Sequence, residues 1–119
     1  MNYSRIPLNL PHAGTVAGRI VYHLQRRGVP IECAKKLLAL LDPYRDRDDP
    51  PSPEEAKRVV EEAARLGRVI VEEIERAGAG DDRLGQSIRN LFECLELGEE
   101  GARISLRAGE DPNSALRPG

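Results

Sequence analysis

Four glutamates on two neighbouring predicted helices are the residues best suited by type to chemistry. They are Glu72, Glu75, Glu93 and Glu96. Spacings of three residues place each pair on one face of a helix. If both faces pointed inward, the carboxylates would offer the oxygen ligands that Mg²⁺ prefers.

The arrangement of these acids resembles the paired acidic helices with which all-α nucleotide pyrophosphohydrolases bind Mg²⁺. The resemblance implies a Mg²⁺-dependent nucleotide hydrolase, which we keep as the second alternative function. A solvated surface is favoured over it, because acids and bases alternate four residues apart along 53–77, as in Lys57 with Glu61. Each such pair contributes only ~0.3 to 0.5 kcal/mol to a helix. We therefore predict no catalytic residues and no metal ligands.

Histidine and cysteine add little catalytic chemistry. Neither His12 nor His23 lies in the HxxH or HExxH spacing that is typical of zinc sites. Cys33 and Cys94 each lie beside leucines in a helical pattern, so we expect buried free thiols and a reducing, cytoplasmic location. The sequence also lacks a P-loop and a GxGxxG motif, and we expect no cofactor.

Basic residues gather in the first third of the chain. Residues 1–41 contain six Lys or Arg and a single acid, whereas residues 42–119 contain twelve bases and nineteen acids. This asymmetry can steer an acidic partner to the basic end, and it can also favour head-to-tail association of copies. Five of the bases form a candidate surface for nucleic acid or an acidic partner: Arg19, Arg26, Arg27, Lys35 and Lys36.

The stretch HLQRRGVPIECAKKLL raises the question of a helix-turn-helix that lies on DNA. Its turn would place Leu24 where a small residue belongs and Arg27 at an apolar position. The second helix would offer one acid and two lysines, without a side chain suited to reading base edges. Single-stranded nucleic acid is not favoured either, because only Tyr22 is available there to stack on bases. A nucleic-acid-associated regulator that contacts phosphates is thus the first alternative function.

Apolar residues recur at spacings of three and four in four segments, which predicts an all-α fold. The expected architecture is a small four-helix bundle in one domain over residues 15–101. Its helices are predicted near residues 15–27, 30–41, 53–77 and 82–97.

Capping residues and breakers set the expected boundaries. Thr15 is a candidate cap for the first helix, Pro30 is expected to open the second, and Ser52 with Glu55 predicts a capping box at the third. Gly98 and Gly101 are expected to stop the fourth.

The two ends of the chain are predicted to lie outside the bundle. Prolines make residues 1–14 an extended arm, because they fix φ and remove backbone donors. Residues 102–119 are expected to form a short element, either a strand or a last turn, followed by a mobile tail.

Our leading hypothesis is a non-enzymatic helical interaction or regulatory protein that acts through a homo-oligomeric or partner-binding surface. The apolar arm and the wide apolar face of the second helix motivate it. The expected anchors are Leu8, Leu10, Leu37, Leu40 and Leu41. No membrane partner is expected, because no segment approaches the ~20 apolar residues of a membrane span.

Overall fold

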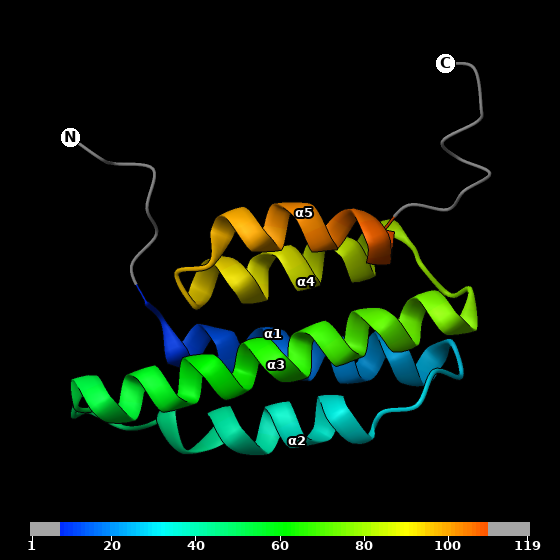
Figure 1. Ribbon diagram of the computed structural model, residues 1–119. Helices are drawn as coiled ribbons and strands as arrows, with labels where there is room; N and C mark the ends of the chain where they lie inside the picture. Colours follow the sequence, from blue (N-terminus) through cyan, green and yellow to red (C-terminus); the bar gives the residue numbers. More distant parts are fainter. Residues whose placement is uncertain (1–7, 110–119) are drawn as a thin grey trace.

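Five α-helices make up most of residues 8–109, the part of the chain that the computed structural model describes (Figure 1). The α-helices are α1 (Leu10–Arg26), α2 (Glu32–Leu41), α3 (Pro53–Ala77), α4 (Asp82–Cys94) and α5 (Gly98–Gly109). A 3₁₀ turn, η1 (Asp42–Tyr44), follows α2. Residues 8–109 contain no strand, which confirms the predicted all-α fold.

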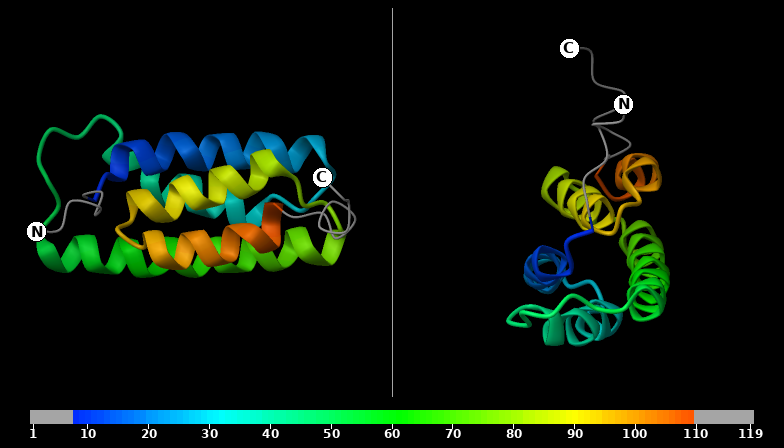
Figure 2. Two further views of the ribbon diagram at one scale, coloured as in Figure 1. Left: turned by 90° about the horizontal axis from the view of Figure 1, so that it is seen from above. Right: turned by 90° about the vertical axis from the view of Figure 1, so that its left-hand side faces the viewer.

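The helices form a closed ring around one core (Figure 2). Around the ring, α1 contacts α2, α2 contacts α3, α3 contacts α5, α5 contacts α4, and α4 returns to α1. α1, α3 and α5 run in one direction and α2 and α4 in the other, so α3 and α5 are parallel neighbours. The predicted four-helix bundle is therefore completed by a fifth helix.

The core is aliphatic, as the composition predicts, with a single phenylalanine among the leucines and isoleucines. Every helix contributes to it, and Ile20, Leu37, Ile70 and Phe92 are fully buried. Burial of these side chains supplies the main stabilisation of the fold.

The start of α3 confirms the predicted Ser52 cap and revises the capping box. The Ser52 hydroxyl oxygen accepts a hydrogen bond from the Glu55 backbone N–H at 3.1 Å. The Glu55 carboxylate accepts instead from the Tyr44 hydroxyl at 2.5 Å and from Arg47 at 2.9 Å. Both hydrogen bonds lower the pKa of Glu55, and the one from Arg47 has the larger effect. The acid expected to cap α3 therefore fastens the preceding loop to it.

The structure corrects the predicted start of the first helix. α1 begins at Leu10, where an extended arm over 1–14 was expected, and Asn9 rather than Thr15 caps it. The Asn9 side chain accepts from the His12 N–H at 3.0 Å. Pro11 is compatible with this start, because the first turn of a helix has backbone N–H groups without helical partners. Residues 1–7 of the predicted arm lie outside the described residues.

The second and fourth helices are shorter than predicted. α2 begins at Glu32 and not at Pro30: after a turn at residues 27–28, where Gly28 has a φ of 70°, residues 29–31 are not helical. α4 ends at Cys94, and Glu96 turns the chain with a φ of 63°.

α5 replaces the expected stop and short element. Gly98 opens this helix rather than ending the previous one, and Gly101 lies inside it. Acids in the first turn, Glu99 and Glu100, favour a helix start through the helix dipole. The predicted tail beyond Gly109 lies outside the described residues.

Two ion pairs join the parallel helices α3 and α5. Arg68 binds Glu100 through two hydrogen bonds of 2.5 and 2.9 Å, and Arg107 binds Glu75 through two of 3.0 and 2.5 Å. Arg68 and Glu75 are seven residues apart on α3, and Glu100 and Arg107 are seven residues apart on α5. The two ion pairs therefore lie along the same line of contact between the helices. Each pair is partly exposed, so this line of contact specifies register more than it adds stability.

Candidate functional site

The leucines predicted to anchor a partner are mostly internal. Leu10, Leu37 and Leu41 are 3 %, 0 % and 0 % exposed and belong to the core of this chain. Leu8 and Leu40 are half-buried and pack against that core. The wide apolar face of α2 is explained by its place between α1 and α3, which cover it from two sides. Of the five predicted anchors, only Leu8 and Leu40 therefore remain partly accessible to a partner.

The four glutamates considered for Mg²⁺ do not come together. Glu75 is paired with Arg107 and Glu93 with Arg89, while Glu72 is exposed on α3. Within residues 8–109, no three His, Cys, Asp or Glu side chains are grouped so that they could hold a metal ion. The carboxylate arrangement expected for a magnesium site is therefore absent from the described helices.

The two cysteines are free and differ in burial. Cys94 is buried, and burial, followed by the charge of Glu93, raises the pKa of its thiol. A thiol with a raised pKa is a weak nucleophile at neutral pH. Cys33 is half-buried on α2. The expectation of a buried thiol is confirmed for Cys94, whereas Cys33 is partly accessible.

Most arginines of the described part are neutralised by acids. Seven form ion pairs: Arg27, Arg45, Arg47, Arg65, Arg68, Arg89 and Arg107. Arg27, one of the five predicted binding residues, pairs with Asp81 at the start of α4. It therefore joins α1 to α4 and is less available to a partner.

The predicted basic surface is also divided between two sides of the molecule. The pKa of Glu62 on α3 is lowered by its hydrogen bond with Arg65 and also by the nearby charge of Lys36. Lys36 thus faces the α2–α3 side, and Lys35 is exposed on α2. Arg19 and Arg26 of α1 lie near His23, as does Arg83 of α4, because the charge of each lowers the pKa of that histidine.

Three arginines gather with two ring side chains on one surface, which we call the basic face. Its members are Arg19, Tyr22, His23 and Arg26 of α1 and Arg83 of α4. Burial lowers the pKa of His23, and so do four nearby guanidinium groups: Arg27, Arg83, Arg26 and Arg19. α1 contains no acid, and the three arginines of the face form no ion pair with any residue of 8–109.

Tyr22 and Arg26 are held together on this face. Arg26 donates a hydrogen bond to the Tyr22 hydroxyl at 3.0 Å, and its guanidinium carbon lies 5.6 Å from the centre of the ring. His23 meets the same ring edge-on, with 5.5 Å between ring centres. Tyr22 remains 53 % exposed. The face therefore presents an aromatic ring among positive charges.

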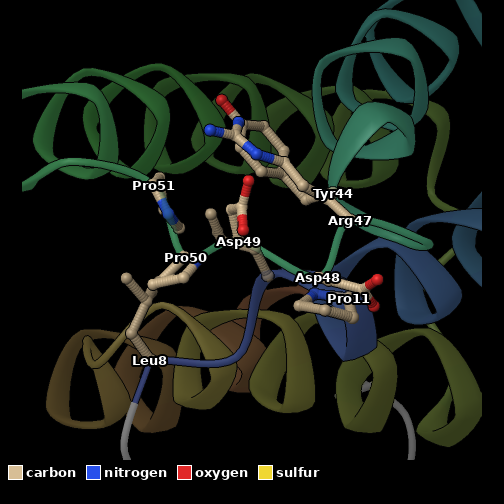
Figure 3. Close-up of a pocket in the computed structure, with 9 residues that line it drawn as sticks. Leu8, Pro11, Tyr44, Arg47, Asp48, Asp49, Pro50 and Pro51 are labelled. Carbon is tan, nitrogen blue, oxygen red and sulfur yellow. The ribbon is translucent and has the colours of Figure 1, made fainter.

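A separate pocket of about 220 Å³ lies between the start of α1 and the loop before α3 (Figure 3). Leu8, Leu10 and Pro11 line one side, and the loop supplies the others: Tyr44, Arg47, Asp48, Asp49, Pro50 and Pro51. The Arg47 guanidinium lies 5.3 Å from the centre of the Tyr44 ring and is bound by Glu55. The positive charge of Arg47 in this pocket is therefore already neutralised by Glu55.

No family model, curated protein or solved structure matches this chain. Among the helices formed by residues 8–109, none has both the length and the apolar character needed to cross a bilayer.

The pKa of His23 tests whether α1 and α4 share the basic face. Arg83→Ala should raise this pKa towards 6.5, because one charge that disfavours the imidazolium form is removed. Titration of the imidazole resonances by NMR measures it. Arg103→Ala, an equal charge change on α5, should leave the pKa unchanged. An unaltered His23 pKa in the Arg83→Ala protein would show that Arg83 does not lie near His23 and does not belong to the basic face.

The same shift fixes a direction for stability against pH. A folded-state pKa below the unfolded value means that the folded chain binds fewer protons. His23 therefore costs stability as the pH falls below about 6.5 and through its folded pKa. Arg83→Ala should lessen this loss, which urea unfolding at neutral and mildly acidic pH would show.

Proposed function

We propose that this chain is a non-enzymatic binding protein that holds an anionic partner on the basic face. The observation that carries the proposal is the contrast between two sets of arginines. Seven are matched to acids, whereas Arg19, Arg26 and Arg83 lie together around His23 without one. Like charges that the fold brings together repel one another, and a bound anion relieves that repulsion.

Other functions receive less support from the structure. A helix-turn-helix is less supported because Lys36 of α2 lies near Glu62 of α3, on the side where α2 meets α3. Self-association through Leu8 and Leu40 stays a prediction, but three of its five proposed anchors lie in the core. The separated glutamates leave the magnesium hydrolase without an assembled site.

Retention on immobilised heparin, a sulfated polyanion, tests the proposal. We expect the wild-type chain to bind at low salt and to elute as salt rises, because screening and counterion competition weaken such contacts. The variant Arg19→Ala/Arg26→Ala/Arg83→Ala should elute at clearly lower salt. The matched control removes three other exposed arginines that form no ion pair within 8–109: Arg58, Arg76 and Arg103.

The control variant distinguishes binding at the basic face from a general effect of net charge. Both variants change the net charge equally, so only the position of the arginines differs. Equal elution of the two variants would contradict the basic face as a binding site. Failure of the wild-type chain to bind heparin at low salt would do the same.

A further inference from the structure

The basic face contains one of two large apolar side chains that are exposed within residues 8–109. These are Tyr22, at 53 %, and Leu106, at 56 % on α5. An isolated exposed leucine is ordinary on a protein surface. A tyrosine ring held by Arg26 and flanked by unpaired arginines is a more specific feature, because it combines positive charge with a planar surface for stacking.

The spacing of these groups suits a flexible strand of phosphates. Arg19, Tyr22 and Arg26 follow one another at three and four residues, so they share one side of α1. Arg19 and Arg26 are seven positions apart, a rise of about 10 Å along the helix, so their guanidinium groups can contact different phosphates of one strand. Arg83 of α4 adds a positive charge near His23, the residue that follows Tyr22 on α1. Guanidinium groups bind phosphate oxygens through two parallel hydrogen bonds.

Resting on the proposed function, we infer that the anionic partner is a single-stranded nucleic acid. Its phosphates contact Arg19, Arg26 and Arg83, and one of its bases stacks on Tyr22. A duplex would satisfy the arginines but keeps its bases stacked on one another, away from the ring. An acidic polypeptide would also satisfy the arginines and would leave the exposed ring unused. A single strand uses both features. The sequence alone did not favour it, because Tyr22 is the one ring available there, but the structure holds that ring exposed against Arg26.

Fluorescence anisotropy with a labelled oligothymidylate of about 15 nucleotides tests this inference. Tyr22→Ala should weaken binding about tenfold, because one stacking contact is lost. Tyr22→Phe keeps the ring and should stay within about twofold of the wild type. The Tyr22→Ala protein should bind an oligoglutamate of equal charge as weakly as the wild type does.

The arginines are tested by the salt dependence of the same binding. Three phosphate contacts give a slope of log affinity against log salt of about −2 for a single strand. The variant Arg19→Ala/Arg26→Ala/Arg83→Ala should lose most of this slope and about 100-fold in affinity at 0.1 M salt. The variant lacking Arg58, Arg76 and Arg103 should keep both.

Distinct outcomes separate this inference from the proposed function. If Tyr22→Ala binds the oligothymidylate as the wild type does, the single-strand inference is wrong while the anionic site stands. The single-strand inference is also wrong if oligoglutamate or a duplex binds as tightly as the single strand, with the same arginine dependence. If no probe binds at low salt and heparin does not retain the chain, both the inference and the proposed function are wrong.

Discussion

Phe92→Ala is expected to lower the free energy of unfolding by about 3–5 kcal/mol. Phe92 is fully buried on α4, and its ring lies against two glycines of other helices. A Cβ on Gly67 of α3 would lie 2.7 Å from Phe92 Cε1, and one on Gly101 of α5 would lie 2.6 Å from Phe92 Cβ. Because glycines have no side chains to move inward, the space vacated by the ring stays largely open.

Urea unfolding followed by circular dichroism measures this loss. Leu106→Ala is the control, because that side chain is 56 % exposed and its removal should change stability by no more than about 0.5 kcal/mol. Phe92→Leu keeps part of the volume and should cost less than Phe92→Ala. A loss below about 1 kcal/mol for Phe92→Ala would contradict the close packing of α3, α4 and α5 around this ring.

A second substitution, at Gly67, tests the contact between this glycine and the Phe92 ring directly. Gly67→Ala in the wild-type background forces the Phe92 ring to move. In the Phe92→Ala background the added methyl group enters empty space. The two substitutions together should therefore cost less than the sum of their separate losses, with a coupling energy of about 0.5–3 kcal/mol.

Local signals in the sequence were sufficient where a boundary depends on local chemistry. α3 begins at Pro53 and ends at Ala77 as predicted, because the Ser52 cap and the left-handed Gly78 act on the backbone beside them. The helical class follows from spacing that persists over many residues. The Asn9 cap of α1 is also a local signal, but the prolines on either side of it favoured an extended arm.

Glycine misled the prediction of α5, because it serves two purposes that look alike in sequence. Gly78 ends a helix by adopting a positive φ of 62°. Gly101 lies within a helix. Glycine is required there because Phe92, nine residues earlier, leaves no room for a side chain. Only the packing of α5 against α4 distinguishes the two cases, and sequence spacing does not report it.

The candidate site depended on tertiary contacts in the same way. Arg19 and Arg26 could be selected from sequence, because they lie on the polar side of a predicted helix. Arg83 was missed, since it joins them only through the contact between α1 and α4. The prediction that Leu10, Leu37 and Leu41 bind a partner was wrong for a related reason. Apolar residues that face a partner and those that face the core have the same spacing in a sequence.

Gly85→Ala is expected to destabilise the fold by about 2–3 kcal/mol, although alanine is the better helix former by about 1 kcal/mol. An added Cβ would lie 2.7 Å from Gly109 Cα and 2.9 Å from the Ser105 carbonyl oxygen. Both contacts are with the backbone of α5, so relief requires the helices to separate. That movement would also strain the hydrogen bond of 3.0 Å from the Asp81 N–H to the Ala108 carbonyl.

Gly18→Ala supplies the matched control, because the same methyl group on α1 meets no atom within 4 Å. This variant should gain about 0.5–1 kcal/mol from helix propensity. Urea midpoints for the two proteins should therefore move in opposite directions, with similar slopes, if both unfold in one step. Stabilisation by both substitutions would show that α4 and α5 do not meet through Gly85 and Gly109, because propensity alone would then account for both effects.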